Sequence, residues 1–128
     1  MKTQIYTPFV GITLKEAIES AYKMSLSSGD SIILKINGMQ FVVKSDAIAY
    51  SLQFVSGFTI SQAIEEAVKA AKVSNKPIIA NINDIQLRIT KNTVAEKALE
   101  IYKRILKDKY DKQMAQFKKA QTEKQNEM

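Results

Sequence analysis

The chain contains no cysteine and no histidine among its 128 residues. It therefore has no disulfide, no thiolate nucleophile, no imidazole acid–base group and no zinc site with nitrogen or sulfur ligands. Glycine and proline are also scarce, at 4 and 2 residues. The glycines Gly11, Gly29, Gly38 and Gly57 are isolated, which excludes a phosphate-binding loop and a Rossmann fingerprint. The sequence predicts a protein that is not an enzyme and that uses no cofactor or metal.

Carboxylates give no sign of catalysis either. The only close acidic pairs, Glu65–Glu66 and Asp108–Asp111, lie among lysines on expected helices, where they are typical of solvated surface. Nothing supports paired-carboxylate hydrolysis or two-metal chemistry, so no catalytic residue is assigned. No apolar run approaches the roughly 20 residues needed to cross a bilayer, and the first residues lack the apolar core of a signal peptide. We expect a cytoplasmic protein with no membrane partner.

Positive charge is what the chain has in excess. Its 19 basic and 13 acidic residues give a net charge of +6, with a pI near 9.5. Residues 91–128 carry 10 basic and 6 acidic side chains, whereas residues 1–90 carry 9 and 7. Such a balance favours nucleic acid or another acidic partner. A helix of mixed lysine and glutamate is also what solubility alone produces.

A repeat organises the first two thirds of the chain. Residues 11–43 align without a gap with residues 57–89, 46 positions later, and 13 of the 33 positions are identical, where chance gives about two. The identical pairs are Gly11/Gly57, Thr13/Thr59, Ala17/Ala63, Ile18/Ile64, Glu19/Glu65, Ala21/Ala67, Lys23/Lys69, Ser28/Ser74, Ile32/Ile78, Ile33/Ile79, Ile36/Ile82, Asn37/Asn83 and Gln40/Gln86. Because solenoid arrays need three or more copies, the sequence predicts a tandem duplication that forms one pseudo-twofold domain, residues 1–92, with units of about 11–56 and 57–92.

Each unit begins with an expected helix. Thr13 and Thr59 are followed three residues later by Glu16 and Gln62, which is the capping-box pattern. Apolar residues then recur with helical spacing, so one stripe of each helix should face a core. The stripes are Leu14, Ala17, Ile18 and Ala21 in the first helix and Ile60, Ala63, Ile64 and Ala67 in the second.

After each helix the sequence predicts a β-hairpin, and therefore an α+β fold with an antiparallel sheet. Asn37-Gly38 is the strongest signal for a two-residue type I′ turn, and Asn83-Asp84 takes the same place in the second unit. A two-residue turn fixes the register and puts six apolar pairs on the face toward the helices. These pairs are Ile36/Met39, Leu34/Phe41, Ile32/Val43, Ile82/Ile85, Ala80/Leu87 and Ile78/Ile89.

Residues 45–56 fit two interpretations. The apolar residues Ile48, Tyr50, Leu52 and Phe54 alternate like a strand, whereas Ile48, Leu52 and Val55 are spaced like a helix. The 46-residue offset aligns Asp46 with Asn92, which precedes a plainly helical segment, and both are good N-caps. We therefore expect a short helix over residues 47–55, ended by Gly57. Residues 2–10 are expected to add an edge strand.

From Thr93 to its end the chain has no glycine or proline, which predicts a basic C-terminal helix over residues 93–128 that frays after about residue 118. A helical apolar stripe continues as far as Phe117, but beyond about Lys107 the helix is too long for a small sheet to cover. Tyr110, Met114 and Phe117 therefore predict an oligomer interface with other copies of the chain, in preference to contact with nucleic acid or a membrane.

The sheet face turned away from the helices carries the candidate binding residues. Gln40 and Gln86 are identical in both units although no cap, core or turn requires them. The predicted set is Lys35, Gln40, Lys44, Asn81, Gln86 and Arg88, which combines cations for phosphates with amides for bases or sugars. A glutamine that satisfies a neighbouring strand remains the alternative. The face lacks the outward aromatic pair of a stacking platform for single strands.

The sequence thus predicts a non-enzymatic, oligomeric protein that binds DNA or RNA through this face and the basic helix. The alternative is an oligomeric interaction or sequestration protein that holds a protein partner or a small polar or anionic ligand. In general style the repeat is similar to small phage and plasmid accessory proteins, with no shared motif that assigns a role to a residue.

Overall fold

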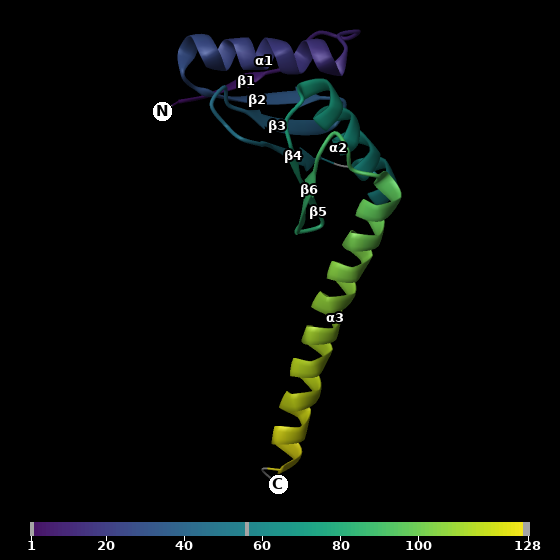
Figure 1. The fold of residues 1–128 in the computed structure, drawn as a ribbon. Coiled ribbons are helices and arrows are strands. Elements are labelled where there is room, and N and C mark those ends of the chain that lie inside the picture. Colours follow the sequence, from purple (N-terminus) through teal and green to yellow (C-terminus); the bar gives the residue numbers. More distant parts are fainter. Residues whose placement is uncertain (1, 56, 127–128) are drawn as a thin grey trace.

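The computed structural model describes residues 2–55 and 57–126, with side chains as far as Met114. Its elements are β1 (Thr3–Tyr6), α1 (Leu14–Ser28), β2 (Ser31–Ile36), β3 (Met39–Val43), β4 (Tyr50–Phe54), α2 (Ile60–Ser74), β5 (Ile78–Ile82), β6 (Ile85–Ile89) and α3 (Ala95–Asn126). The six strands form one sheet in chain order, from β1 at one edge to β6 at the other. Figure 1 shows α1 lying along the sheet and α3 leading away from it. The fold is α+β, as predicted.

Both helix starts form where the sequence places them. Gln62 N–H donates to Thr59 Oγ1 and Thr59 N–H donates to Gln62 Oε1, each at 3.1 Å, which completes a capping box. The first start has only half of the predicted box, because Glu16 N–H donates to Thr13 Oγ1 at 3.2 Å and no return bond is formed. There the Glu16 carboxylate contributes through its charge near the positive end of the helix dipole.

Both hairpins have the register that the sequence predicts, with Ile36 opposite Met39 and Ile82 opposite Ile85. All four turn residues have positive φ, as a type I′ turn requires. The angles are 50° and 76° at Asn37 and Gly38, and 50° and 66° at Asn83 and Asp84. The six predicted apolar pairs are all buried, and α1 and α2 cover that face of the sheet.

The helix expected over residues 47–55 is wrong, because the segment forms strand β4. β4 lies between β3 and β5, antiparallel to the first and parallel to the second. The 46-residue offset aligns this segment with the residues after Asn92, which form α3. Residues 50–54 form a strand instead because they have strand partners on both sides. Gly57, with a φ of 79°, lies in the connection from β4 to α2 and does not end a helix.

The sheet is mixed, which corrects the expectation of an antiparallel one. The predicted edge strand within residues 2–10 is confirmed as β1, and it runs parallel to β2. β4 likewise runs parallel to β5. Each parallel pair is joined through a helix, since parallel neighbours need a long crossover connection.

The domain has two halves, β1–α1–β2–β3 and β4–α2–β5–β6, each with strand, helix, strand and strand in that order. The halves lie side by side in the sheet, and corresponding strands run in the same direction. The strand registers also match at the 46-residue offset, since Gln4 lies opposite Ile32 and Tyr50 opposite Ile78. A twofold arrangement would reverse the order of the second half, whereas the observed order β1 to β6 repeats it. The pseudo-twofold expectation is therefore wrong, and the edges β1 and β6 are unlike each other.

Among its described side chains, those of α3 that are buried against the rest of the protein lie in its first turns. Ala98 and Tyr102 are buried where α3 meets α2 and β6, and Asn83 Nδ2 donates to Tyr102 Oη at 3.1 Å. From Leu106 to Met114 the side chains are exposed, and the helix continues to Asn126. Fraying beyond residue 118 stays a prediction. Among the described residues, no helix is both long and apolar enough to cross a membrane.

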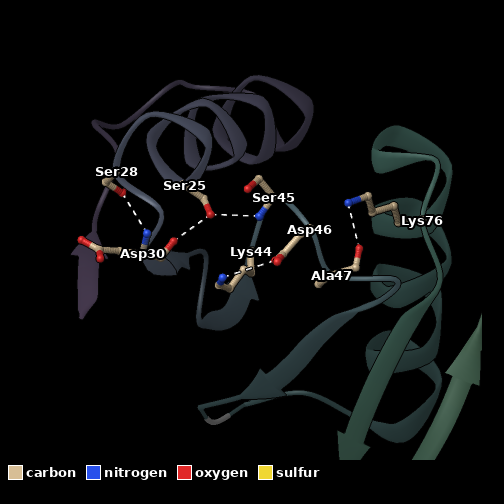
Figure 2. A network of polar contacts seen from close by, with 8 residues as sticks. All are labelled: Ser25, Ser28, Asp30, Lys44, Ser45, Asp46, Ala47 and Lys76. Atoms are coloured by element: carbon tan, nitrogen blue, oxygen red, sulfur yellow. Dashed lines mark hydrogen bonds and ion pairs between the residues drawn. The ribbon is translucent and has the colours of Figure 1, made fainter. Parts of the chain in front are cut away.

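The connection from β3 to β4 is tied to both halves, as Figure 2 shows. Ser25 is fully buried at the end of α1, donates to the Asp30 carbonyl oxygen at 2.7 Å and accepts from Ser45 N–H at 2.9 Å. On the other side, Lys76 Nζ donates to the Ala47 carbonyl oxygen at 3.0 Å. Residues 44–47 therefore hold the end of α1 and the start of β5 in a fixed relation.

Replacing Ser25 with Ala should lower the free energy of unfolding by about 1–3 kcal/mol, because Ser45 N–H loses its acceptor inside the protein. The matched control is Ser27→Ala on the same helix, where the side chain is exposed and the expected change is below about 0.5 kcal/mol. Urea unfolding followed by circular dichroism measures both variants. Equal losses in the two would contradict the structural role of the Ser25 hydroxyl.

Candidate binding face

The sheet face opposite α1 and α2 is the candidate site and is called the outer face. Side chains alternate between the two faces along every strand, and the buried ones all lie on the inner side. α1 packs on β2 and β3, and α2 packs on β5 and β6, from that inner side. No helix covers the outer face within residues 2–55 and 57–126. Its side chains are therefore in contact with solvent.

Four amide side chains form a line across the outer face, called the amide row. Gln40 lies opposite Gln53, Gln53 opposite Asn81, and Asn81 opposite Gln86. Neighbouring strands are about 4.8 Å apart, so the row extends about 14 Å from β3 to β6. Lys35 lies opposite Gln40 and adds a cation at the β2 end of the row.

The amides of this row make no side-chain hydrogen bond within the described part of the chain. Gln53 and Gln86 are exposed, while Gln40 and Asn81 are half-buried between their neighbours. Each free primary amide offers two N–H donors and a carbonyl acceptor. The row can therefore read donors and acceptors on a ligand, as base edges and sugar hydroxyls present them.

The predicted binding residues are only partly brought together. Lys35, Gln40, Asn81 and Gln86 lie in one line, and Arg88, two residues beyond Gln86, faces the same side opposite Ile79. Lys44 lies four residues from Gln40, about 13 Å along the chain direction. Its Nζ pairs with Asp46 Oδ1 at 3.3 Å, and its side chain is 22% exposed. Lys44 is thus neutralised in part and stands apart from the row.

Gln53 was not predicted, although it occupies the middle of the row. The sequence predicts a helix over this segment, and the 46-residue offset aligns Gln53 with Thr7, so the repeat does not single it out. The signal in the sequence was the alternation of inward Tyr50 and Leu52 with outward Ser51 and Gln53. A strand interpretation of that alternation would have found it.

A second row, mostly aliphatic, lies next to the amide row. From β1 to β6 it runs through Ile5, Ile33, Val42, Ser51, Ile79 and Arg88, so a serine interrupts it and an arginine ends it. Ile5 and Val42 are exposed, at 63% and 42%. In the described strands no aromatic ring points outward, because Tyr6 and Tyr50 belong to the inner side. The outer face therefore supplies no stacking platform for unpaired bases.

A hollow of about 250 Å³ lies on the helix side of the sheet, between the middle of α1 and the C-terminal end of α2. Lys76 Nζ lies 4.8 Å from the ring centre of Tyr50 and 5.5 Å from that of Tyr22. The ammonium group is thus held by two rings and by the Ala47 carbonyl oxygen. Burial raises the pKa of Tyr50, and the nearby Tyr22 hydroxyl raises it further. We interpret this cluster as a contact between the two halves.

Neither metal chemistry nor similarity adds to the assignment. Among the described side chains, no group of three or more acidic residues gathers that could hold a metal ion. Comparisons with family models, with curated proteins and with solved structures gave no match.

The raised pKa of Tyr50 predicts a pH dependence of stability. The unfolded chain releases the Tyr50 proton near the ordinary pKa of 10.0, and the folded protein releases it only at a higher pH. The stability that depends on the neutral hydroxyl is therefore fully present below about pH 10 and is lost as the pH rises further. Tyr50→Phe keeps a ring beside Lys76 and should lose less stability than the parent between about pH 8 and about pH 11. Urea unfolding at both pH values measures this. Tyr110→Phe, on the exposed part of α3, is the control, and equal losses in parent and Tyr50→Phe would contradict the assignment.

Proposed function

We propose that the chain is a non-enzymatic nucleic-acid-binding protein that holds DNA or RNA on its outer face. The amide row carries this proposal, because four unbonded amides in register on an uncovered sheet of a basic protein have no structural task. A solvated face that served only solubility would show charges of both signs. The outer face instead presents mainly amides and aliphatic side chains, with Lys35 beside Gln40 and Arg88 beyond Gln86.

The proposed contacts divide by chemistry. Lys35 and Arg88 contact phosphates, and each such contact releases counterions and makes binding dependent on salt. The amides contact base edges or sugars, where glutamine and asparagine pair well with adenine. The basic residues of α3, in a segment with a net charge of +4 over residues 91–128, add phosphate contacts beyond the sheet. The lack of outward rings favours a duplex over single strands.

The second candidate is an oligomeric interaction or sequestration protein. It is favoured by Leu106, Tyr110 and Met114, which are 46%, 59% and 37% exposed and continue the apolar stripe of α3 beyond the buried Tyr102. In this candidate the stripe joins copies of the chain, and a protein partner or a small polar or anionic ligand binds at their boundary. Phe117, the third predicted interface residue, lies outside the described side chains.

We also infer that the two halves arose by tandem duplication. Supporting observations are the 13 identities in 33 aligned positions and the same order of elements in each half. The matching strand registers at the same offset add to them. The outer face would then carry two copies of an ancestral surface, with Gln40 and Gln86 as the retained residues.

Affinity for a duplex of about 20 base pairs should fall steeply between about 50 and about 200 mM salt. Lys35→Gln with Arg88→Gln should lower the slope of log affinity against log salt by about two, at about one per cation. Gln53→Ala should weaken binding about five- to a hundredfold without changing the slope, because it removes one amide contact. Fluorescence anisotropy with labelled DNA and RNA measures these effects.

The matched control for charge is Lys15→Gln with Lys72→Gln, since both lysines are exposed on the helix side. This variant loses the same two charges and should keep most of its salt slope. Equal effects of the two double variants would remove the outer face from the proposal. No binding to duplex or single-stranded DNA or RNA at low salt would overturn the proposed function itself.

The oligomer expected from the second candidate depends on the α3 stripe. Leu106→Lys with Tyr110→Lys should lower the mass measured by light scattering, because two cations cannot be buried in an apolar contact. Asp108→Ala with Asp111→Ala changes the net charge equally on the opposite side of the helix and should leave the mass unchanged. A parent chain that is strictly monomeric would contradict this candidate.

A further inference from the structure

We propose that copies of the chain assemble edge to edge, with β6 of one copy pairing antiparallel with β1 of the next. The sheet would then continue from one copy to another. This inference concerns the two edges of the sheet and does not depend on a ligand at the outer face. Three observations carry it: free backbone groups at both edges, an internal junction of the same kind, and a groove beside β6.

β6 has free hydrogen-bonding groups along its outer edge. In a hairpin closed by a two-residue turn, the residues that flank the turn bond to each other across the pair. Ile85 and Leu87 therefore bond to β5, while the N–H and C=O groups of Gln86 and Arg88 point away from it. This edge has no strand partner among the described residues.

β1 offers the complementary set at the other edge. Ser31 N–H donates to the Lys2 carbonyl oxygen at 3.2 Å, which shows that Lys2 faces β2. Alternate residues of a parallel strand face the same neighbour, so Gln4 and Tyr6 also bond to β2. The backbone groups of Ile5 therefore point outward. Both edges thus present groups at every second residue, as a ladder requires.

The molecule already contains such a junction once, at its centre. β3 ends the first half and β4 begins the second, and they pair antiparallel with Gln40 opposite Gln53 and Val42 opposite Ser51. β6 and β1 occupy the same places in their own halves. Shifting the central register by 46 residues places Arg88 opposite Ile5 of the next copy.

The same shift gives chemically compatible neighbours on both faces. On the inner side, the buried Leu87 lies opposite Tyr6 of the next copy, so an apolar residue meets a ring. On the outer side, Gln86 lies opposite Thr7 of the next copy, which continues the amide row with a hydroxyl group. Pro8 follows, and in this register its nitrogen points away from β6, so the ladder does not need a donor from it.

A groove of about 500 Å³ lies beside β6, where β1 of the next copy would bind. Leu87 of β6 lines it together with Val94, which immediately precedes α3, and with Ile101 and Ile105 of α3. Val94 and Ile101 are 52% and 47% exposed, although Ala98, between them in the sequence, is buried. A strand in the groove would cover these aliphatic side chains with its own inner residues, Tyr6 in particular.

The unlike edges decide the symmetry of the assembly. A pair joined about a twofold axis would use the same edge twice, whereas β6 to β1 pairing uses different edges and is heterologous. Each added copy leaves one free β1 and one free β6. The assembly therefore grows as a chain of copies or closes as a ring.

Engineered disulfides test the pairing directly, because the parent has no cysteine. The test variant is Ile5→Cys with Arg88→Cys, whose Cα atoms would be about 5.5 Å apart across the junction, within disulfide reach. Within one copy the two positions are separated by five strand spacings, about 24 Å, and cannot be joined. Oxidation without nucleic acid should give a ladder of covalently linked copies that a reductant removes.

Two control variants fix the register and the symmetry. Thr3→Cys with Arg88→Cys is displaced by two residues, about 7 Å along the strand, and should give little cross-linking. Arg88→Cys alone should remain unlinked, whereas efficient dimers would mean β6 to β6 pairing and would overturn the proposal. Cross-linking that is absent in the test variant, or equal in the displaced control, would also overturn it.

A reversible measurement covers the case in which the cysteine variants do not fold. Sedimentation of the unmodified chain should show a mass that rises with protein concentration. Ile5→Lys should weaken association about two- to fivefold, because the new lysine would lie opposite Arg88 of the neighbouring copy and repel it. Adding Arg88→Glu to Ile5→Lys should restore it. A rescue that fails would overturn the register. All arms are repeated in the Leu106→Lys, Tyr110→Lys background, so that pairing through α3 does not contribute.

Discussion

The antiparallel pairing of β3 with β4 is the contact on which the rest of the structure depends. Each half alone has three strands and one helix, too little to bury a substantial core. Their pairing makes one six-stranded sheet and places Phe41 and Leu52 side by side in a common interior. It also aligns Gln40 with Gln53, so that the amides of the two halves lie in one row. The buried hydroxyl of Ser25 and the ammonium of Lys76 hold the chain on its way between these strands.

Features that depend on neighbours in sequence were predicted, and features that depend on distant partners were not. The turn at Asn37 needs only its own two residues, and it fixes the register of a whole hairpin. Residues 50–54 satisfy both periodicities, and only the presence of β3 and β5 on either side selects the strand. Because a helix is predicted over this segment, the sequence does not predict Gln53 as a binding residue, although it predicts Gln40 and Asn81 in the same row. The direction in which the second half follows the first is also a property of the assembled sheet.

The outer face differs from an ordinary solvated sheet in the kind of polarity it has. Ion pairs hold their water strongly, and stripping it costs several kcal/mol per ion. Amides such as Gln53 and Asn81 cost less to desolvate, yet leaving one unpaired in a contact costs about 1–3 kcal/mol. A face built from amides and aliphatic side chains can therefore be covered at modest cost, and only by a partner whose donors and acceptors match. Lys35 and Arg88 at its borders act over longer distances and bring an acidic partner near before that matching begins.

The length of α3 has a consequence for how the molecule behaves in solution. With 32 residues at a rise of 1.5 Å each, the helix is about 48 Å long, whereas a small domain is about 30 Å across. Figure 1 shows most of this rod standing clear of the body. A particle of this shape tumbles and diffuses more slowly than a sphere of equal mass. A single copy would thus elute from a sizing column like a heavier compact protein. As the molecule rotates, the free end of α3 would pass through a volume much larger than that of the domain.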